Sequence, residues 1–119
     1  SFRIRNQRGG FFPCAKVHFC FPAEDVCLIE LGSRRRGIFG GSREELADLP
    51  YLRVSNRLQT SDDEALITAI GNTQGQGIHV SVARGLEVQK HGHVFFSAIR
   101  NGNSGGPALN EAGEVIGVV

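Results

Sequence analysis

Short apolar runs, each ended by glycine, proline or a polar turn, constrain this fold more than any other feature of the sequence. The runs occupy residues 2–8, 11–21, 25–31, 52–54, 64–70, 78–88, 94–99 and 115–119. Runs of this length between breakers are typical of β-strands, and none indicates a long helix. The 16 glycines and 8 phenylalanines, with no methionine or tryptophan, favour the same turn-rich architecture. We therefore predict an all-β barrel or sandwich.

Charge and hydropathy argue against several classes of partner. The chain has 119 residues, and its 13 Lys and Arg residues nearly balance its 12 Asp and Glu residues, which leaves a formal net charge of +1. Such a balance offers no electrostatic argument for binding nucleic acid or an anionic membrane. No apolar run approaches the roughly 18 to 20 residues that a membrane-spanning helix needs. We expect neither a nucleic-acid partner nor a membrane span in these residues.

The first three runs predict a connected set of strands. Residues 2–8 alternate between apolar and basic side chains, and Gly9-Gly10 breaks the pattern before residues 11–21 resume an extended stretch, which is a hairpin signal. A turn at residues 22–24 then leads into residues 25–31, an almost wholly apolar run that we expect to form a buried strand. The first residue of that run is a carboxylate, Asp25.

The three cysteines, Cys14, Cys20 and Cys27, cannot all pair within the chain. Cys14 and Cys20 lie six residues apart on one predicted strand. At roughly 3.3 Å per residue their Cα atoms would stand about 20 Å apart, which is beyond the reach of a disulfide. We expect core thiols and no disulfide framework, and this expectation leaves the cellular compartment open.

A segment of different character separates the early runs from the later ones. Arg34-Arg35-Arg36 lies among glycines, and Ser42 could cap a single helical turn. The arginines could contact phosphate, but a solvated loop is the favoured interpretation because the overall charge is balanced. Apolar runs on both sides indicate a linker or insertion, so we predict two halves, residues 1–50 and 51–119.

The sequence Gly-Asn-Ser-Gly-Gly-Pro at residues 102–107 is the most specific candidate for chemistry. Glycines on both sides of Ser104 allow a tight bend, expose its Oγ and leave backbone N–H groups beside it. This arrangement predicts a nucleophile next to an oxyanion hole. The alternative is a glycine-rich hairpin loop with an incidental serine, and the six residues together favour the nucleophile.

This loop resembles the nucleophile motif of the trypsin-like serine proteases, and its surroundings are similar to the HtrA (Deg) family. The resemblance extends over most of the chain through residues 15–29, 69–72 and 113–118, and it is poorest in the long segment 32–50. It implies a trypsin-like double antiparallel β-barrel, with the later part of the N-terminal barrel up to about Pro50 and most of the C-terminal barrel after it.

The resemblance also implies roles for individual residues. Ser104 would be the nucleophile, and Asp25, which precedes it as in the family, would orient an imidazole. The N–H groups of Gly102 and Ser104 would form the oxyanion hole, and Ile99 would line a pocket for a small to medium apolar side chain. Without the resemblance, a carboxylate at the start of an apolar strand is more often a turn cap. No cofactor or metal is required.

In trypsin-like proteases a histidine acts as general base between the serine and the aspartate, and this sequence has no evident counterpart of that histidine. The resemblance places it upstream of Asp25 and before Ser1, and the family pattern also continues beyond Val119, so we expect the chain to be part of a longer protein. His18 could approach Asp25 only if the intervening turn folded back.

The other three histidines have simpler interpretations. His91 and His93 could share a metal ion, but no third ligand stands at an obvious spacing, so a solvated hairpin is favoured. His79 begins an apolar run and suits core or edge packing.

Together these observations predict a serine endopeptidase that hydrolyses polypeptides through an acyl-enzyme, although residues 1–119 alone would be inactive for want of a base. The alternative is a catalytically inactive protease fold that serves as a peptide-binding or assembly module. A third interpretation, a viral or cytosolic chymotrypsin-like protease, would have the same chemistry in a different biological context. The resemblance further implies a trimer-based homo-oligomer, a role in protein quality control and a periplasmic or secreted location, while unpaired cysteines would also suit the cytoplasm.

Overall fold

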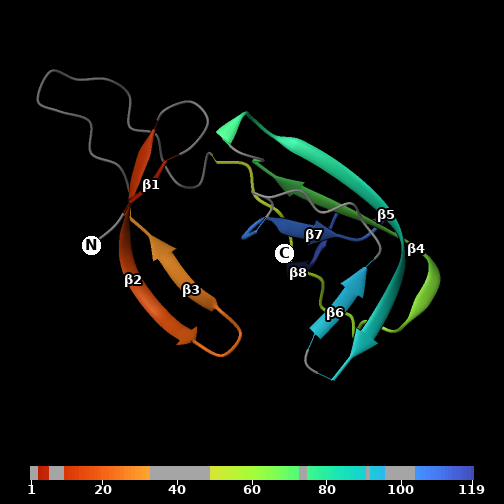
Figure 1. Cartoon of the computed structure of the whole chain (residues 1–119). Helices are drawn as coiled ribbons and strands as arrows, with labels where there is room; N and C mark the ends of the chain where they lie inside the picture. Colours follow the sequence, from red (N-terminus) through yellow and green to blue (C-terminus); the bar gives the residue numbers. More distant parts are fainter. Residues whose placement is uncertain (1–2, 6–9, 33–48, 73–74, 91, 96–103) are drawn as a thin grey trace, which may run out of the picture. The chain divides into compact units, whose positions relative to one another are not determined.

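The computed structural model describes the chain except for residues 1–2, 6–9, 33–48, 73–74, 91 and 96–103. Its described residues form eight β-strands and no α-helix (Figure 1). They fall into two compact units, Ser1–Pro50 and Tyr51–Val119. The prediction of an all-β chain is therefore confirmed for the part that the structure describes.

The first unit is a three-stranded antiparallel sheet. It contains β1 (Arg3–Arg5), β2 (Phe11–Phe21) and β3 (Val26–Leu31), in the order β1-β2-β3. The predicted hairpins are confirmed, since Ile4 lies opposite Phe12 in the first. In the second, residues 22–25 form the turn between β2 and β3.

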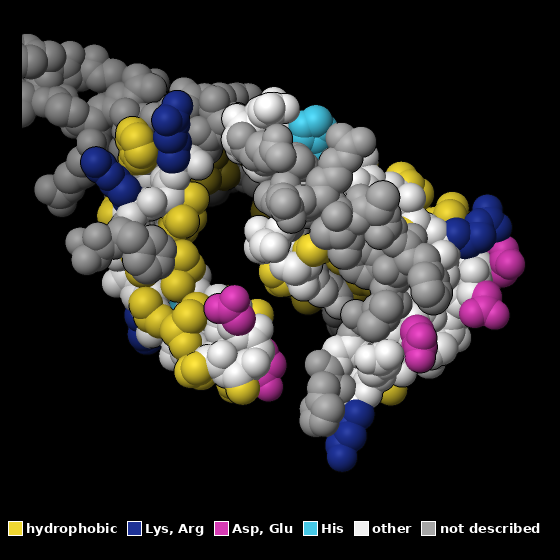
Figure 2. All heavy atoms as spheres, in the orientation of Figure 1, with side chains coloured by type: hydrophobic (Ala, Val, Ile, Leu, Met, Phe, Trp, Pro, Cys, Tyr) yellow, Lys and Arg dark blue, Asp and Glu magenta, His cyan; other side chains and the backbone are white. Residues whose placement is uncertain are grey.

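Burial in the first unit differs from the prediction. Phe12 is 1% exposed, but every residue of β3 is exposed or half-buried, so the expectation of a buried strand at residues 25–31 is wrong. Hydrophobic side chains are visible along the β2–β3 hairpin in Figure 2. The apolar run determines strand formation, whereas burial needs a second layer of side chains over the same face.

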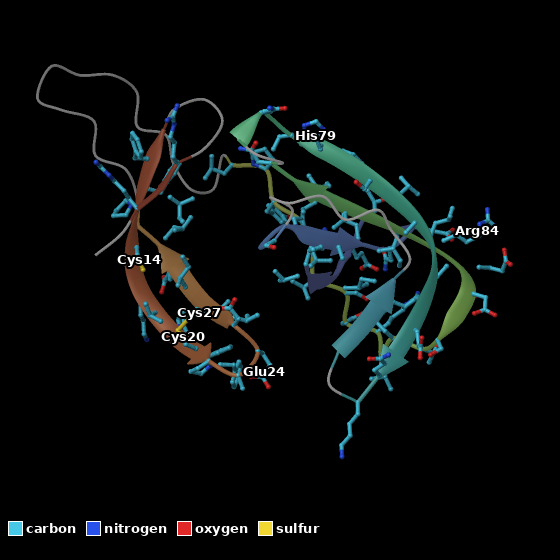
Figure 3. The ribbon with its side chains drawn as sticks, viewed as in Figure 1. Cys14, Cys20, Glu24, Cys27, His79 and Arg84 are labelled. Atoms are coloured by element: carbon cyan, nitrogen blue, oxygen red, sulfur yellow. A yellow bond between two sulfur atoms is a disulfide. The ribbon has the colours of Figure 1, made fainter. Side chains whose placement is uncertain are left out.

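The prediction of core thiols without a disulfide is also wrong. Cys20 and Cys27 form a disulfide between β2 and β3, while Cys14 is free and half-buried (Figure 3). The two bonded residues are cross-strand partners, with Cα atoms 4.1 Å apart. The argument that Cys14 and Cys20 are too far apart on one strand holds, but the turn brings a different pair together.

The second unit is a five-stranded antiparallel sheet in the order β6-β5-β4-β7-β8. Its strands are β4 (Asp62–Gly71), β5 (His79–Gln89), β6 (Gly92–Phe95), β7 (Pro107–Leu109) and β8 (Val115–Val118). The sequence missed β7, which lies between β4 and β8. The run at residues 52–54 contributes only an isolated parallel bridge, from Val54 to Val115.

One face of this sheet carries the core. Ile67, Leu86 and Ala108 are at most 5% exposed and pack together, with Val88 and Ile116 against them. On the opposite face, Val80 and Val82 on β5 are 61% and 64% exposed. Unbroken alternation along β5 would place all four of these β5 residues on one face. The alternation is interrupted at Gly85, which has a φ of +102° and lies where the register against β4 shifts, so that the buried positions change from Ala83 to Leu86.

Several predicted features lie outside the described residues, namely Arg34-Arg35-Arg36, the helical turn after Ser42 and most of the linker segment. Within the described part of the chain there is no helix with the length and hydropathy that crossing a bilayer requires.

Candidate active-site residues

Ser104 lies in an exposed turn that leads directly into β7. The two residues after it are tied to the end of the chain: the Gly105 amide donates to the Val119 carbonyl (2.8 Å), and the Val119 amide donates to the Gly106 carbonyl (2.9 Å). These bonds extend the pairing of β7 with β8 by two residues. The second half of the nucleophile loop is therefore held by the sheet, while the Ser104 side chain remains accessible.

Gly105 has a conformation that explains the glycine after the serine. Its φ is +85°, in the left-handed region that residues with a Cβ rarely adopt. Its amide is already bonded to Val119, so it is not free to bind an oxyanion. The oxyanion role expected for the amides of Gly102 and Ser104 stays a prediction. Gly102 lies outside the described residues.

Asp25 is the last residue of the turn between β2 and β3 and is exposed. Its φ of +56° makes it the one non-glycine residue with a positive φ among those described. Two hydrogen bonds close the turn, from the Glu24 amide to the Phe21 carbonyl (3.2 Å) and from the Asp25 amide to the Pro22 carbonyl (3.3 Å). Aspartate tolerates this conformation better than most residues. The turn-residue interpretation thus has a specific structural basis, which does not conflict with a role for the carboxylate.

His18 binds a carboxylate other than Asp25. Its Nε2 lies 3.2 Å from Oε2 of Glu30 on β3, and both side chains are partly exposed. His18 sits at an irregularity of β2 between Val17 and Phe19, which shifts its pairing along β3. The two candidates therefore lie on one hairpin, but the side-chain contact that forms is between His18 and Glu30.

The remaining candidates are not brought into one described site. Asp25 belongs to the first unit and Ser104 to the second. Ile99 and His91 lie outside the described residues, and His79 is half-buried at the start of β5. Among the residues that the structure describes, no group of three His, Cys, Asp or Glu side chains could hold a metal ion.

A cavity of about 330 Å³ opens in the second unit, and its described lining does not include Ser104. Its walls come from the segment before β4, from β4 and β5, and from the turn between β7 and β8; they include Arg57, Asp62, Ile67, Leu86 and Glu111.

The sequence did not predict two interactions of the β2–β3 hairpin, namely the Cys20–Cys27 disulfide and the contact between His18 and Glu30. The position of the turn could have indicated the first of them. Cys20 and Cys27 stand one residue outside Phe21 and Val26, the pair that closes the turn. Placing the turn at residues 22–25 would have been enough to put the cysteines opposite each other. The partner of His18 was harder to find, because the irregularity in β2 shifts the register by one residue before Glu30 is reached.

Comparison with known proteins identifies the family. A family model described as the trypsin-like peptidase domain matches residues 6–118. No curated protein sequence matches significantly. Among solved structures, the crystal structure of the serine endoprotease from Yersinia pestis matches with a TM-score of 0.63 and 21% identity. The match covers 98% of this chain but 38% of that one, and at this identity it bears on the fold alone. The structural match confirms the predicted trypsin-like fold with its two antiparallel sheets, and the family model shows that the chain belongs to the trypsin-like peptidase domain family.

Proposed function

We propose that this chain is part of a serine endopeptidase of the HtrA type that hydrolyses polypeptides through an acyl-enzyme. The observation that carries the proposal is the position of Ser104, exposed within the Gly-Asn-Ser-Gly-Gly-Pro loop and followed at once by two residues that are hydrogen-bonded to Val119, directly after β8. A rigid backbone beside an accessible hydroxyl is what a serine nucleophile needs. Membership of the peptidase family and the name of the Yersinia pestis structure support the same reaction class.

In this proposal each candidate residue has a defined task. The Ser104 Oγ attacks the scissile carbonyl while an imidazole takes its proton, and Asp25 orients that imidazole and stabilises the imidazolium. The amides of Gly102 and Ser104 stabilise the developing oxyanion. Ile99 lines the pocket for the substrate side chain before the cleaved bond and favours small to medium apolar residues.

We propose that the general base is a histidine which residues 1–119 do not supply. His18 is engaged with Glu30, and His79 is half-buried at the start of β5. In the complete protein, the first unit would represent the later part of the N-terminal barrel and the second unit most of the C-terminal barrel.

The remaining parts of the proposal concern the whole protein. We propose polypeptide substrates, a trimer-based homo-oligomer, a role in protein quality control and a periplasmic or secreted location. The Cys20–Cys27 disulfide supports an oxidising compartment and removes the main argument for the cytoplasm, although Cys14 is free.

The test uses the full-length protein and a Ser104→Ala variant. Stoichiometric labelling of Ser104 by a fluorophosphonate, with casein hydrolysis that falls by several orders of magnitude in the variant, is the expected result. Undiminished hydrolysis by Ser104→Ala would overturn the assignment. Binding of unfolded polypeptide without labelling or hydrolysis would favour the peptide-binding module instead.

A further inference from the structure

We propose that the Cys20–Cys27 disulfide is a redox-sensitive clamp on Asp25. With the bond intact, the hairpin end holds the carboxylate in the position that catalysis needs; when a small dithiol reduces the bond, the turn loosens and peptidase activity falls. The inference rests on the proposed function, because it assigns to Asp25 the task of orienting the catalytic imidazole. It makes the two cysteines positioning residues rather than catalytic ones.

The turn that carries Asp25 is weakly held by its own hydrogen bonds. The bonds donated by Glu24 and Asp25 measure 3.2 and 3.3 Å, at the long end of the range for amide and carbonyl groups. Aspartate tolerates the φ of +56° at Asp25 better than most residues with a Cβ, but less well than glycine. Such a conformation persists only where the surrounding structure over-determines it. The turn therefore depends on a constraint from the strands on either side.

Packing around the hairpin end supplies little of that constraint. Phe21 is 53% exposed, Leu28 is 49% exposed and Val26 is 39% exposed. The rings of Phe19 and Phe21 contact each other with centroids 5.1 Å apart, and both lie on the same strand. By contrast, the disulfide joins β2 to β3 covalently one residue outside the Phe21 and Val26 pair. It is the strongest link between the two strands at this end (Figure 3).

Both cysteines are exposed, so a thiol in solution can reach them. The thiolate of a dithiol attacks one sulfur to form a mixed disulfide and releases the other cysteine as its thiol. The second thiol of the reagent then attacks the reagent's own sulfur in the mixed disulfide, which releases the remaining cysteine as a thiol. Two electrons and two protons pass to the protein, and the dithiol becomes a cyclic disulfide. Exposed disulfides are the kind that take part in such exchange.

Cys14 provides a matched control on the same strand. It is free, it lies opposite Leu31, and it is six residues from Cys20 along β2. Replacing it with serine removes a thiol without touching the clamp. The variant Cys20→Val/Cys27→Val removes the clamp and keeps an apolar cross-strand pair in its place.

The first measurement is hydrogen exchange, which does not depend on activity. In the full-length protein, mass spectrometry of alkylated thiols first verifies that dithiothreitol has opened the bond. The backbone amides of residues 20–27 should then exchange at least about tenfold faster in the wild type and in Cys14→Ser. Those of residues 108–117, in the β7–β8 hairpin, should not change. Unchanged exchange at residues 20–27 after verified reduction would overturn the clamp, as would full protection in the valine variant.

The second measurement separates the clamp from the proposed function. Reduction should lower the kcat of the wild type and of Cys14→Ser by about tenfold or more, because a displaced Asp25 carboxylate no longer orients the imidazole, and should leave the kcat of the valine variant unchanged. Hydrolysis that depends on Ser104 but ignores reduction of the bond would overturn the clamp alone. Hydrolysis that survives Ser104→Ala would overturn the proposed function instead.

Discussion

Asp25 adopts a positive φ in its turn and is proposed to orient the catalytic imidazole, and a substitution can separate these two roles. Asparagine tolerates the left-handed region nearly as well as aspartate, so Asp25→Asn should leave the free energy of unfolding within about 0.5 kcal/mol of the wild type. The amide would favour the wrong imidazole tautomer and should reduce the kcat of the full-length protein roughly 10⁴-fold. Chemical denaturation and steady-state kinetics check the two effects.

Asp25→Gly is the matched control for this prediction. Glycine suits the φ of +56° better than aspartate, so this variant should be as stable as the wild type or more stable by up to about 1 kcal/mol. It lacks the carboxylate and should lose at least as much activity as Asp25→Asn. An unchanged kcat/KM in both variants would mean that Asp25 is only a turn residue.

A substitution at Gly105 can likewise separate an effect on stability from an effect on catalysis. A Cβ there would meet nothing within 4 Å, so the cost of Gly105→Ala arises from its φ of +85°, at about 1–2 kcal/mol. Relief of that strain should also move the neighbouring Ser104, and a displacement of about 1 Å at a catalytic group can cost 10²-fold in kcat. Thermal denaturation and peptidase kinetics of the full-length protein provide the measurements.

Gly113 provides the control for Gly105. It has a φ of +76°, also with nothing within 4 Å of its Cβ position, and it lies in the turn between β7 and β8. Gly113→Ala should therefore destabilise the protein by a similar amount and leave kcat close to the wild-type value. Equal losses of activity in the two variants would show that Gly105 acts through global stability rather than through Ser104.

At the scale of elements, the sheet of the second unit depends on the side chains that β4 and β5 place on its core face. Ile67 on β4 is 2% exposed and packs against Leu86 and Ala108. Ile67→Ala removes buried methyl and methylene groups and should cost about 2–5 kcal/mol of unfolding free energy. Val82 on β5 is 64% exposed, and Val82→Ala should cost less than about 1 kcal/mol. Urea denaturation compares the two, and similar losses would contradict the assignment of faces.

The elements also show how far a local pattern predicts a strand. The runs that became β2, β4 and β5 were found because each alternates or stays apolar over many residues. By contrast, β7 was missed because it has only three residues and begins with Pro107, directly after two glycines. Its extended state is specified by pairing with β4 on one side and β8 on the other. The pairing with β4 joins residues about 40 positions apart, such as Thr68 and Leu109, which no local pattern reports.

At the scale of the whole molecule, we predict that residues 1–119 produced alone will not react at Ser104. The histidine that β2 carries is paired with Glu30, so no described histidine of the first unit is paired with Asp25. Several large apolar residues of the β2–β3 hairpin are exposed, including Phe19 at 47% and Phe21 at 53%, and such surface promotes self-association.

A fluorophosphonate probe and light scattering test this prediction on the purified 119-residue chain. We expect no labelling of Ser104 and a mass in solution above that of a monomer. Stoichiometric labelling of Ser104 on a stable monomer would contradict it, and would show that a histidine within these residues supplies the base.

The sequence by itself determined the local features of this protein. The alternation of apolar residues and breakers was enough to indicate most of the strands, and the glycines around Ser104 were enough to indicate a tight turn there, because both depend on steric preferences within a few residues. The left-handed Gly105 agrees with that reading. The tertiary structure decided which side chains meet. Cys20 bonds to Cys27, and His18 pairs with Glu30 rather than Asp25, because turn position and strand irregularities set the register between β2 and β3. A shift of one residue in that register changes every partner along the strand, so these contacts follow from the assembled sheet and not from the order of residues within each run.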